Sequence, residues 1–279
     1  MGSVGTLFLV ATPIGNLGDV SARALTTLRQ VAFVICEDTR RSRILLDAHG
    51  ITVPLVSMPA FAEGERAHGL VRRIAAGEDA ALVTDAGSPA VSDPGERLVA
   101  EALEAGLQVV AIPGPTALVA ALSVSGLPTG RFHFLGFLPR AAGEARTMVE
   151  EVRPLSATLA LYEAPGRVGA TLALLHEVLG ERRACVAREL TKLHEEVVRG
   201  TLSELAGRYA DAEVRGEVVL LVEGAARRER WSEAEVQKAL REAIAAGARL
   251  KGLSQELADR SGWPAKELYR LGLALKPEP

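Results

Sequence analysis

Short apolar runs alternate with helical patterns over residues 1–125, and this alternation constrains the fold more than any other feature of the sequence. The runs cover residues 6–12, 33–36, 53–56, 80–83 and 109–112. Unbroken apolar runs are typical of parallel strands that are buried on both faces. Strands that alternate with helices predict right-handed crossovers and a parallel sheet.

The pattern changes after residue 125. Strands are predicted over residues 158–162, 184–187, 195–198 and 217–222, with helices over residues 168–179 and 202–209. These strands follow one another at shorter intervals, which indicates a mixed or antiparallel sheet. Three Phe residues, at positions 132, 134 and 137, predict a segment that plugs an interface between two lobes. We expect two α/β lobes, residues 1–125 and 126–225, and a small helical region over residues 226–279.

Every pattern in the C-terminal region is helical, and this region holds 11 basic and 8 acidic residues. Ser232 and Glu235 have the spacing of a capping box at the start of a helix. Residues 253–268 are typical of a helix, a Gly turn and a second helix that begins at a proline. A helix-turn-helix unit and a plain helical hairpin both explain this spacing.

Composition excludes several classes of protein. The formal net charge of −3 provides no global basic field for nucleic acid. The apolar runs are far shorter than the roughly 20 residues of a membrane span, and the N-terminus lacks the pattern of a secretory signal. Cys36 and Cys185 lie in separate apolar runs, which predicts buried free thiols in a reducing cytoplasm. The sequence contains no dinucleotide or P-loop fingerprint and no metal-ligand spacing, so no metal site is predicted.

Three loops of small residues follow predicted strands, at residues 13–19, 86–95 and 113–117. In a parallel sheet such loops share one edge and can converge on one ligand. Small residues allow backbone N–H and C=O groups to approach that ligand closely. The second and third loops hold no Lys or Arg, which favours a neutral or zwitterionic ligand over a polyphosphate. A single loop of this kind would be an ordinary tight turn.

Arg40, Arg41 and Arg43 fall within four residues at the start of a predicted helix. The helix macrodipole disfavours cations at this end, although Asp38 is expected to cap the helix and to offset part of the cost. A contact with nucleic-acid phosphates and a solvated helix end both explain the arrangement.

Polar residues also close two predicted strands of the second lobe. Tyr162 and Glu163 end one strand, and residues 188–192 (RELTK) follow another. Their side chains either face a cleft between the lobes or form structural ion pairs, and the sequence leaves both alternatives open.

Eight segments carry a more specific signal. They are VATPIGNLGDVSARAL, EDTRRSRILL, VTDAGSPAVSDPG, IPGPTALVAALSVSGLP, FHFLGFLPR, LYEAPGR, ARELTKLHEE and GEVVLLVEG. Together, and in this order, they resemble rRNA small-subunit methyltransferase I, the ribose-methylating branch of the tetrapyrrole methylase superfamily. Residues from about Trp231 onward resemble the small helical region of that family more loosely.

The resemblance implies two α/β lobes of the tetrapyrrole-methylase type, usually in a homodimer, with S-adenosylmethionine (SAM) in the cleft between them. It implies methyl transfer to the 2′-hydroxyl of a cytidine in the decoding region of small-subunit (16S) rRNA, with that rRNA or the 30S subunit as partner. By motif position, the expected cofactor contacts are Pro13, Ala86, Gly87, Ser88, Pro89, Val91, Thr116, Ala117, Tyr162 and Glu163.

A ribose hydroxyl is a poor nucleophile and benefits from a general base. The candidates for that base are Glu37, Asp38, Glu189 and Lys192, and the sequence does not choose among them. Arg40, Arg41 and Arg43 would bind RNA phosphate. Two other classes stay open, a methylase of small molecules such as tetrapyrroles and a non-enzymatic RNA-binding or ribosome-assembly module.

Overall fold

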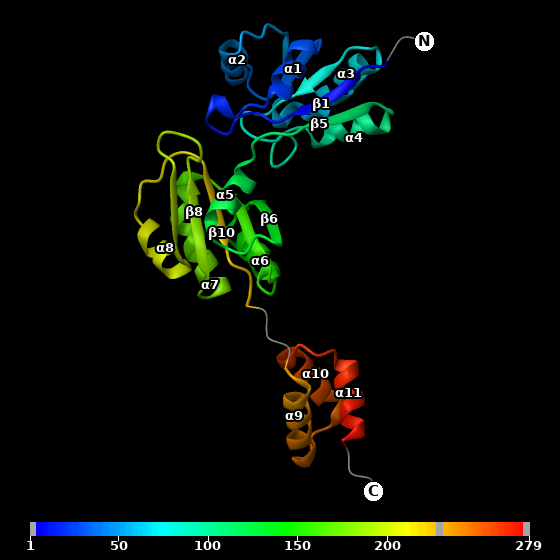
Figure 1. Ribbon diagram of the computed structural model, residues 1–279, viewed down its shortest axis with the longest axis vertical. Helices are drawn as coiled ribbons and strands as arrows, with labels where there is room; N and C mark the ends of the chain where they lie inside the picture. Colours follow the sequence, from blue (N-terminus) through cyan, green and yellow to red (C-terminus); the bar gives the residue numbers. More distant parts are fainter. Residues whose placement is uncertain (1–3, 227–230, 276–279) are drawn as a thin grey trace. The chain divides into compact units, whose positions relative to one another are not determined.

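The computed structural model describes residues 4–226 and 231–275. Its contacts divide the chain into two compact units, residues 1–224 and residues 225–279. The larger unit contains two sheets, and the smaller unit is helical (Figure 1). Within the described residues, no helix combines the length and the apolar character that a membrane span requires.

The first sheet is parallel, as predicted. Its strands are β1 (Thr6–Val10), β2 (Phe33–Cys36), β3 (Leu55–Ser57), β4 (Ala80–Leu82) and β5 (Gln108–Ile112). They lie in the order β3-β2-β4-β1-β5, and every pair is parallel. The carboxyl ends of all five strands therefore meet at one edge, where parallel sheets bind ligands.

Helices cover both faces of this sheet (Figure 1). One face packs against α1 (Ala22–Gln30) and α2 (Thr39–Ala48), and the other against α3 (Glu63–Ala75) and α4 (Glu96–Glu104), with the short turns η1 (Leu17–Asp19) and η2 (Ala60–Ala62) between elements. The side chain of Asp38 caps α2 by accepting the Arg40 N–H, which confirms the predicted cap. That bond satisfies one of the N–H groups left free at a helix start.

The second sheet is mixed, which confirms the prediction from its strand spacing. Its strands are β6 (Phe132–Phe137), β7 (Thr158–Glu163), β8 (Arg183–Arg188), β9 (Glu196–Thr201) and β10 (Val218–Val222), in the order β6-β7-β10-β8-β9. Only β6 and β7 are parallel among these neighbours. One face packs against α6 (Ala142–Val152), α7 (Val168–Leu179) and α8 (Leu202–Tyr209), with the short turn η3 (Pro165–Arg167) before α7.

Helix α5 (Ala117–Ser125) covers the other face of the second sheet (Figure 1). Its Leu118, Ala121 and Leu122 share a core with β7, β8 and β10. The predicted lobe boundary near Ser125 follows this helix, whereas its packing favours a boundary before it. We therefore propose that the second lobe begins with α5.

The three Phe residues that were predicted to plug an interface between the lobes have different surroundings, and Phe137 lines the cavity described below. They lie on the edge strand β6, where Phe132 is exposed to solvent. Phe134 packs inside the second lobe, with its ring centroid 5.0 Å from that of Tyr162. An edge strand has a neighbour on one side only, so part of its apolar surface stays uncovered.

The C-terminal unit is a bundle of three helices, α9 (Glu233–Ala245), α10 (Leu250–Ser261) and α11 (Ala265–Ala274). Ser232 and Glu235 form the predicted capping box, and Gly262 ends α10 in the left-handed conformation. Six buried apolar residues give this unit a core of its own. Of its basic residues, Arg227, Arg228, Arg230 and Lys276 lie outside the described residues.

Candidate functional site

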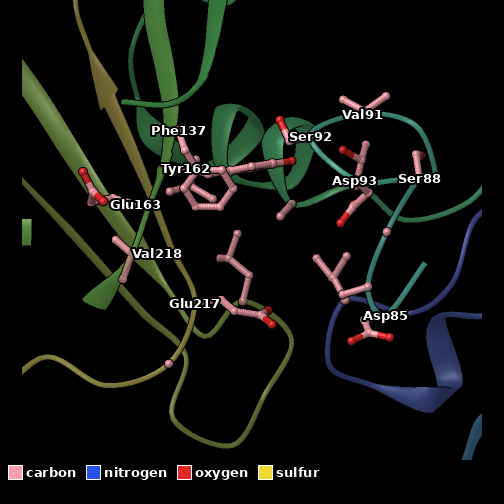
Figure 2. Close-up of a pocket in the computed structure, with 18 of the residues that line it drawn as sticks. Asp85, Ser88, Val91, Ser92, Asp93, Phe137, Tyr162, Glu163, Glu217 and Val218 are labelled. Atoms are coloured by element: carbon pink, nitrogen blue, oxygen red, sulfur yellow. The ribbon is translucent and has the colours of Figure 1, made fainter. Parts of the chain in front are cut away.

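A cavity of about 330 Å³ lies at the carboxyl edge of the first sheet. Residues that follow β1, β2, β4 and β5 line one side, and residues at the ends of β6, β7 and β10 line the other. Figure 2 shows Ser88, Val91 and Asp93 on one side of the cavity and Tyr162 with Glu163 on the other. Its volume falls within the range of small-molecule sites.

Direct contacts hold the three small-residue loops together. Thr12 and Gly87 exchange two backbone hydrogen bonds of 2.9 and 3.1 Å, which joins the loop after β1 to the loop after β4. A Cβ on Gly114 would lie 3.0 Å from the Cβ of Ala11, so the third loop packs tightly against the end of β1. The predicted convergence of the loops is therefore confirmed.

Aromatic rings form the wall opposite these loops. The rings of Phe137 and Tyr162 lie 5.6 Å apart, and both residues line the cavity. Gly136 adopts φ +64° at an irregularity in the β6–β7 pairing, just before Phe137. A bulge of this kind redirects the next side chain, here toward the cavity. Burial raises the pKa of the Tyr162 hydroxyl, so Tyr162 is uncharged at neutral pH.

Four carboxylates give the cavity a negative charge. They belong to Glu37, Asp85, Asp93 and Glu217. Burial raises the pKa of Asp93 to about 6, and the other three carboxylates add to this rise. Burial also raises the pKa values of Glu37 and Asp85. A cleft lined by one sign of charge attracts groups of the opposite sign.

Glu163 is different from these four, because its carboxylate is fully buried and fully engaged. It accepts the backbone N–H of Ala164 at 2.7 Å and the hydroxyl of Thr171 at 2.6 Å. The guanidinium of Arg167 lies 3.5 Å away and donates to two backbone carbonyls just after β6. Glu163 therefore fixes the turn after β7 at the side of the cavity.

Most residues predicted to contact the cofactor line this cavity. They are Ala86, Gly87, Ser88, Val91, Thr116, Ala117, Tyr162 and Glu163. Pro13 lines a neighbouring cavity instead, and Pro89 is buried and lines neither. A proline ring fixes φ, so these two residues set the course of their loops without offering a hydrogen-bond donor.

The candidates for the general base occupy different environments, and Glu37 alone among them lines the cavity. Asp38 caps α2, and hydrogen bonds from Arg40 lower the pKa of Asp38 to about 2. The Lys192 Nζ lies 2.8 Å from Glu189 Oε1. Burial lowers the pKa of Lys192, but the carboxylates of Glu189 and Glu217 raise it by more. The net pKa is raised, which keeps the amine protonated. These pairings disfavour Asp38, Glu189 and Lys192 as proton acceptors.

The three arginines near the start of α2 do not act as one patch. Arg40 is exposed, and its guanidinium lies 2.8 Å from Asp38. Arg41 lines the cavity, with Nη1 3.2 Å from Asp85 Oδ2. Arg43 is half-buried. The side chains of Arg40 and Arg41 are both exposed, at 90% and 63%, and of these two only Arg41 lines the cavity.

The sequence interpretation did not select several residues of the cavity, among them Asp85, Asp93, Glu217 and Phe137. Asp93 lies in a loop that it selected and Asp85 directly precedes that loop, and two Asp without Lys or Arg already indicate a positively charged ligand. Glu217 and Phe137 carry no comparable signal, because only the pairing of the second sheet brings them to the site.

Comparison with known proteins assigns the fold and the family. The model of the family "Tetrapyrrole (Corrin/Porphyrin) Methylases" matches residues 6–206. The chain belongs to this family. A uroporphyrin-III C-methyl transferase from Thermus thermophilus, solved in complex with S-adenyl homocysteine, has a TM-score of 0.57 at 21% identity, covering 82% of this chain and 96% of that one. At this identity the likeness shows the fold alone, and it confirms the predicted tetrapyrrole-methylase fold.

Two relatives within the methylase family cover nearly the whole chain, and both are named ribosomal RNA small subunit methyltransferase I. The protein from Mesorhizobium japonicum is 44% identical over 272 residues, which is 97% of this chain and 92% of the relative. The protein from Synechocystis sp. is 42% identical over 278 residues, 99% of this chain and 100% of the relative. The predicted resemblance to this branch of the family is confirmed.

A second cavity of about 240 Å³ adjoins the first in this member of the family. The two cavities share Ile14, Arg41, Asp85, Ala86 and Glu217. The rest of the second cavity comes from the loop after β1, from α2, from Thr84 after β4 and from the loop after β8. Within the described residues, no group of three or more His, Cys, Asp or Glu is arranged to hold a metal ion.

Proposed function

We propose that this protein transfers a methyl group from SAM to the 2′-hydroxyl of a cytidine in small-subunit rRNA. The supporting observation is the cavity of small-residue loops, aromatic rings and carboxylates, found in a chain whose relatives are named ribosomal RNA small subunit methyltransferase I. The alternative of a tetrapyrrole substrate draws on the broader family match and on the shared fold.

The lining of the cavity fits SAM. The cofactor carries a positive sulfonium and a positive amino group, which match the four carboxylates. Its flat adenine matches the rings of Phe137 and Tyr162. Gly87, at φ +86°, keeps the loop backbone close to the cavity.

SAM supplies a methyl group that its sulfonium already activates. The residues of the chain therefore have to bind, to orient and to accept a proton. Positioning two reactants in a near-attack arrangement is worth roughly 7–11 kcal/mol of barrier. The rigid contacts between Thr12 and Gly87, and the buried carboxylate of Glu163, supply such positioning on the two sides of the cavity.

The RNA partner is proposed to reach the site along the start of α2. Arg40 is exposed there and is suited to a phosphate contact. The resemblance to the rRNA methyltransferases also supports a homodimer in the cytoplasm, which sedimentation of the purified protein and localisation of a tagged copy would test.

Label transfer tests the proposed function. The pure protein is incubated with tritiated SAM and either 30S subunits from a strain without the protein, the corresponding naked rRNA, or a precorrin. We expect label in rRNA, and mass mapping should find one 2′-O-methylcytidine that the strain without the protein lacks. Label in the precorrin alone would favour the tetrapyrrole alternative. No transfer to any of the three would favour a non-enzymatic RNA-binding or assembly module.

A further inference from the structure

The second cavity has the features of a site for one nucleoside. It adjoins the proposed cofactor cavity through a common wall, so a bound group would lie next to the cofactor. Its lining carries two cations, Arg41 and Lys192, their ion-pair partners Asp85 and Glu217, and apolar side chains from η1 and α2. RNA is read mainly through bases that are splayed out of the helix and stacked on side chains, with cations against the backbone.

The mouth of this cavity carries two exposed apolar side chains. Ile44 is 64% exposed and Leu17 is 42% exposed, although both line the cavity. Ile44 lies one turn after Arg40 and Arg41 on α2. Exposed apolar residues at the rim of a cavity are typical of binding sites, and here they lie next to the cations that a polynucleotide requires.

Asp85 lies in the wall between the two cavities. Its Oδ2 is held by Arg41 at 3.2 Å, whereas its Oδ1 is buried and has no hydrogen-bond partner. The ion pair orients the carboxylate, and the unpartnered oxygen is available to a hydroxyl donor. A group that lies between two bound reactants is well placed to take a proton during transfer.

We propose that the second cavity binds the target nucleoside of the RNA, flipped out of its strand, and that Asp85 accepts the proton of its 2′-hydroxyl. The 2′-oxygen forms a bond to the methyl carbon, while the bond from that carbon to sulfur breaks and its electron pair stays on the sulfur. The proton moves to Asp85 and then to solvent. This inference rests on the proposed function and adds the place of the nucleoside and the identity of the base.

Several charged groups face Asp85 and set its proton affinity. Arg41 lowers the pKa of Asp85, whereas Asp38 at the start of α2 and Glu217, itself bound by Lys192 and placed before β10, raise it through their charges. Glu37 and Asp93 also lie near Asp85, whose charge raises their pKa values. Burial and the carboxylates outweigh Arg41 and raise the pKa of Asp85. The methyl-transfer rate should therefore rise with pH through a value above the ordinary pKa of about 4 and then level off.

Two pairs of measurements test the assignment of the second cavity. Ile44 lines only the second cavity, so Ile44→Ala alters that cavity alone. Phe137, which is 53% exposed, lines only the cofactor cavity, so Phe137→Ala is the matched substitution there. We expect Ile44→Ala to raise the KM for 30S subunits about tenfold and to leave the SAM Kd, from titration calorimetry, within twofold. Phe137→Ala should weaken SAM binding about tenfold and leave the KM for 30S subunits within threefold. Normal subunit kinetics in Ile44→Ala would overturn the assignment.

Single-turnover rates with saturating SAM and 30S subunits test Asp85. We expect Asp85→Asn to lower the rate at least 100-fold and to abolish its rising pH limb, since general bases typically contribute 10²–10⁴-fold. Asp85→Glu should recover part of the rate, and Glu217→Gln should move the limb to lower pH by removing a negative charge that raises the pKa of Asp85. A wild-type pH limb in Asp85→Asn would overturn the role of Asp85. If the wild-type protein methylates no RNA, the proposed function itself fails.

Discussion

The two sheets build opposite sides of one cavity by different means. The first sheet contributes loops of small residues, such as Ala86 and Gly87, whose backbone conformation sets the shape of the surface. The second sheet contributes larger side chains, such as Tyr162 and Glu163, which ring contacts and hydrogen bonds hold in place. The side built by the first sheet therefore depends on free space around its backbone, and the side built by the second sheet depends on buried hydrogen-bond partners. Different substitutions should disrupt the two sides.

The largest effect is expected where the loop after β4 ends. Gly95 has φ +131°, and a Cβ there would lie 2.5 Å from the buried Leu82 Cδ2. Its N–H also donates to Glu63 Oε1 at 3.0 Å. We expect Gly95→Ala to cost about 2–5 kcal/mol of unfolding free energy, from backbone strain and overpacking, and to weaken SAM binding at least tenfold. Urea unfolding and titration calorimetry measure both.

Gly143 is the matched control for this substitution. It lies in the first turn of α6, and a Cβ there would meet no atom within 4 Å. Alanine at this position should change stability by less than about 1 kcal/mol, in the direction of stabilisation. Equal stability of Gly95→Ala and Gly143→Ala would show that the first side of the cavity does not depend on its backbone conformation.

The first side was also the side that sequence could predict. The elements of the parallel sheet follow from unbroken apolar runs, and caps such as Asp38 follow from local hydrogen-bonding chemistry. The convergence of the loops follows from the parallel topology alone. These features depend on residues close together in sequence or on a general rule for sheets.

The second side could not be predicted in the same way. Phe137 reaches the cavity through an irregularity in β6, and Glu217 through the antiparallel pairing of β10. Sequence also could not separate paired charges from unpaired ones, because Lys192 is held by carboxylates 3 and 25 residues away. Burial decides which of the carboxylates has a raised pKa, and burial is a property of the assembled lobes.

On the second side, the largest effect is expected from the loss of a buried partner. Glu163→Ala leaves the Thr171 hydroxyl and the Ala164 N–H without their acceptor and removes the carboxylate that pairs with Arg167. We expect a loss of about 2–4 kcal/mol of unfolding free energy. Glu217→Ala, which removes an exposed cavity carboxylate, should cost less than about 1 kcal/mol. Urea unfolding of the two variants compares them, and equal losses would contradict a special role for the buried carboxylate.

A smaller and pH-dependent effect is expected at Asp93. Its pKa is about 6 in the folded protein, against an ordinary value of 3.8, so between these values the folded state holds more protons than the unfolded state. Stability is therefore lost as the pH rises from about 4 to about 6. Asp93→Asn cannot ionise and should be more stable than the wild type at pH 8 by about 1–3 kcal/mol.

Urea unfolding of the wild type and of Asp93→Asn at pH 8 and near pH 4 measures this difference in stability. The advantage of Asp93→Asn should shrink toward zero at the lower pH, where Asp93 is protonated in both states. A difference that is the same at both pH values would instead point to a change in packing. Ionisation of Asp93 would then have no effect on the free energy of unfolding.

The smallest effect is expected outside the cavity, at Arg40. Its side chain is exposed and pairs only with Asp38 among the ion pairs of the described residues. We expect Arg40→Ala to weaken rRNA binding several-fold at low salt and to reduce the slope of log K against log salt by about 1, the effect of one lost phosphate contact. SAM affinity should not change. The control is Arg183→Ala, since Arg183 pairs with Glu223 at the ends of β8 and β10 that lie away from the cavity. A slope that falls equally in both variants would mean that Arg40 acts through net charge, and the start of α2 would lose its proposed contact with RNA.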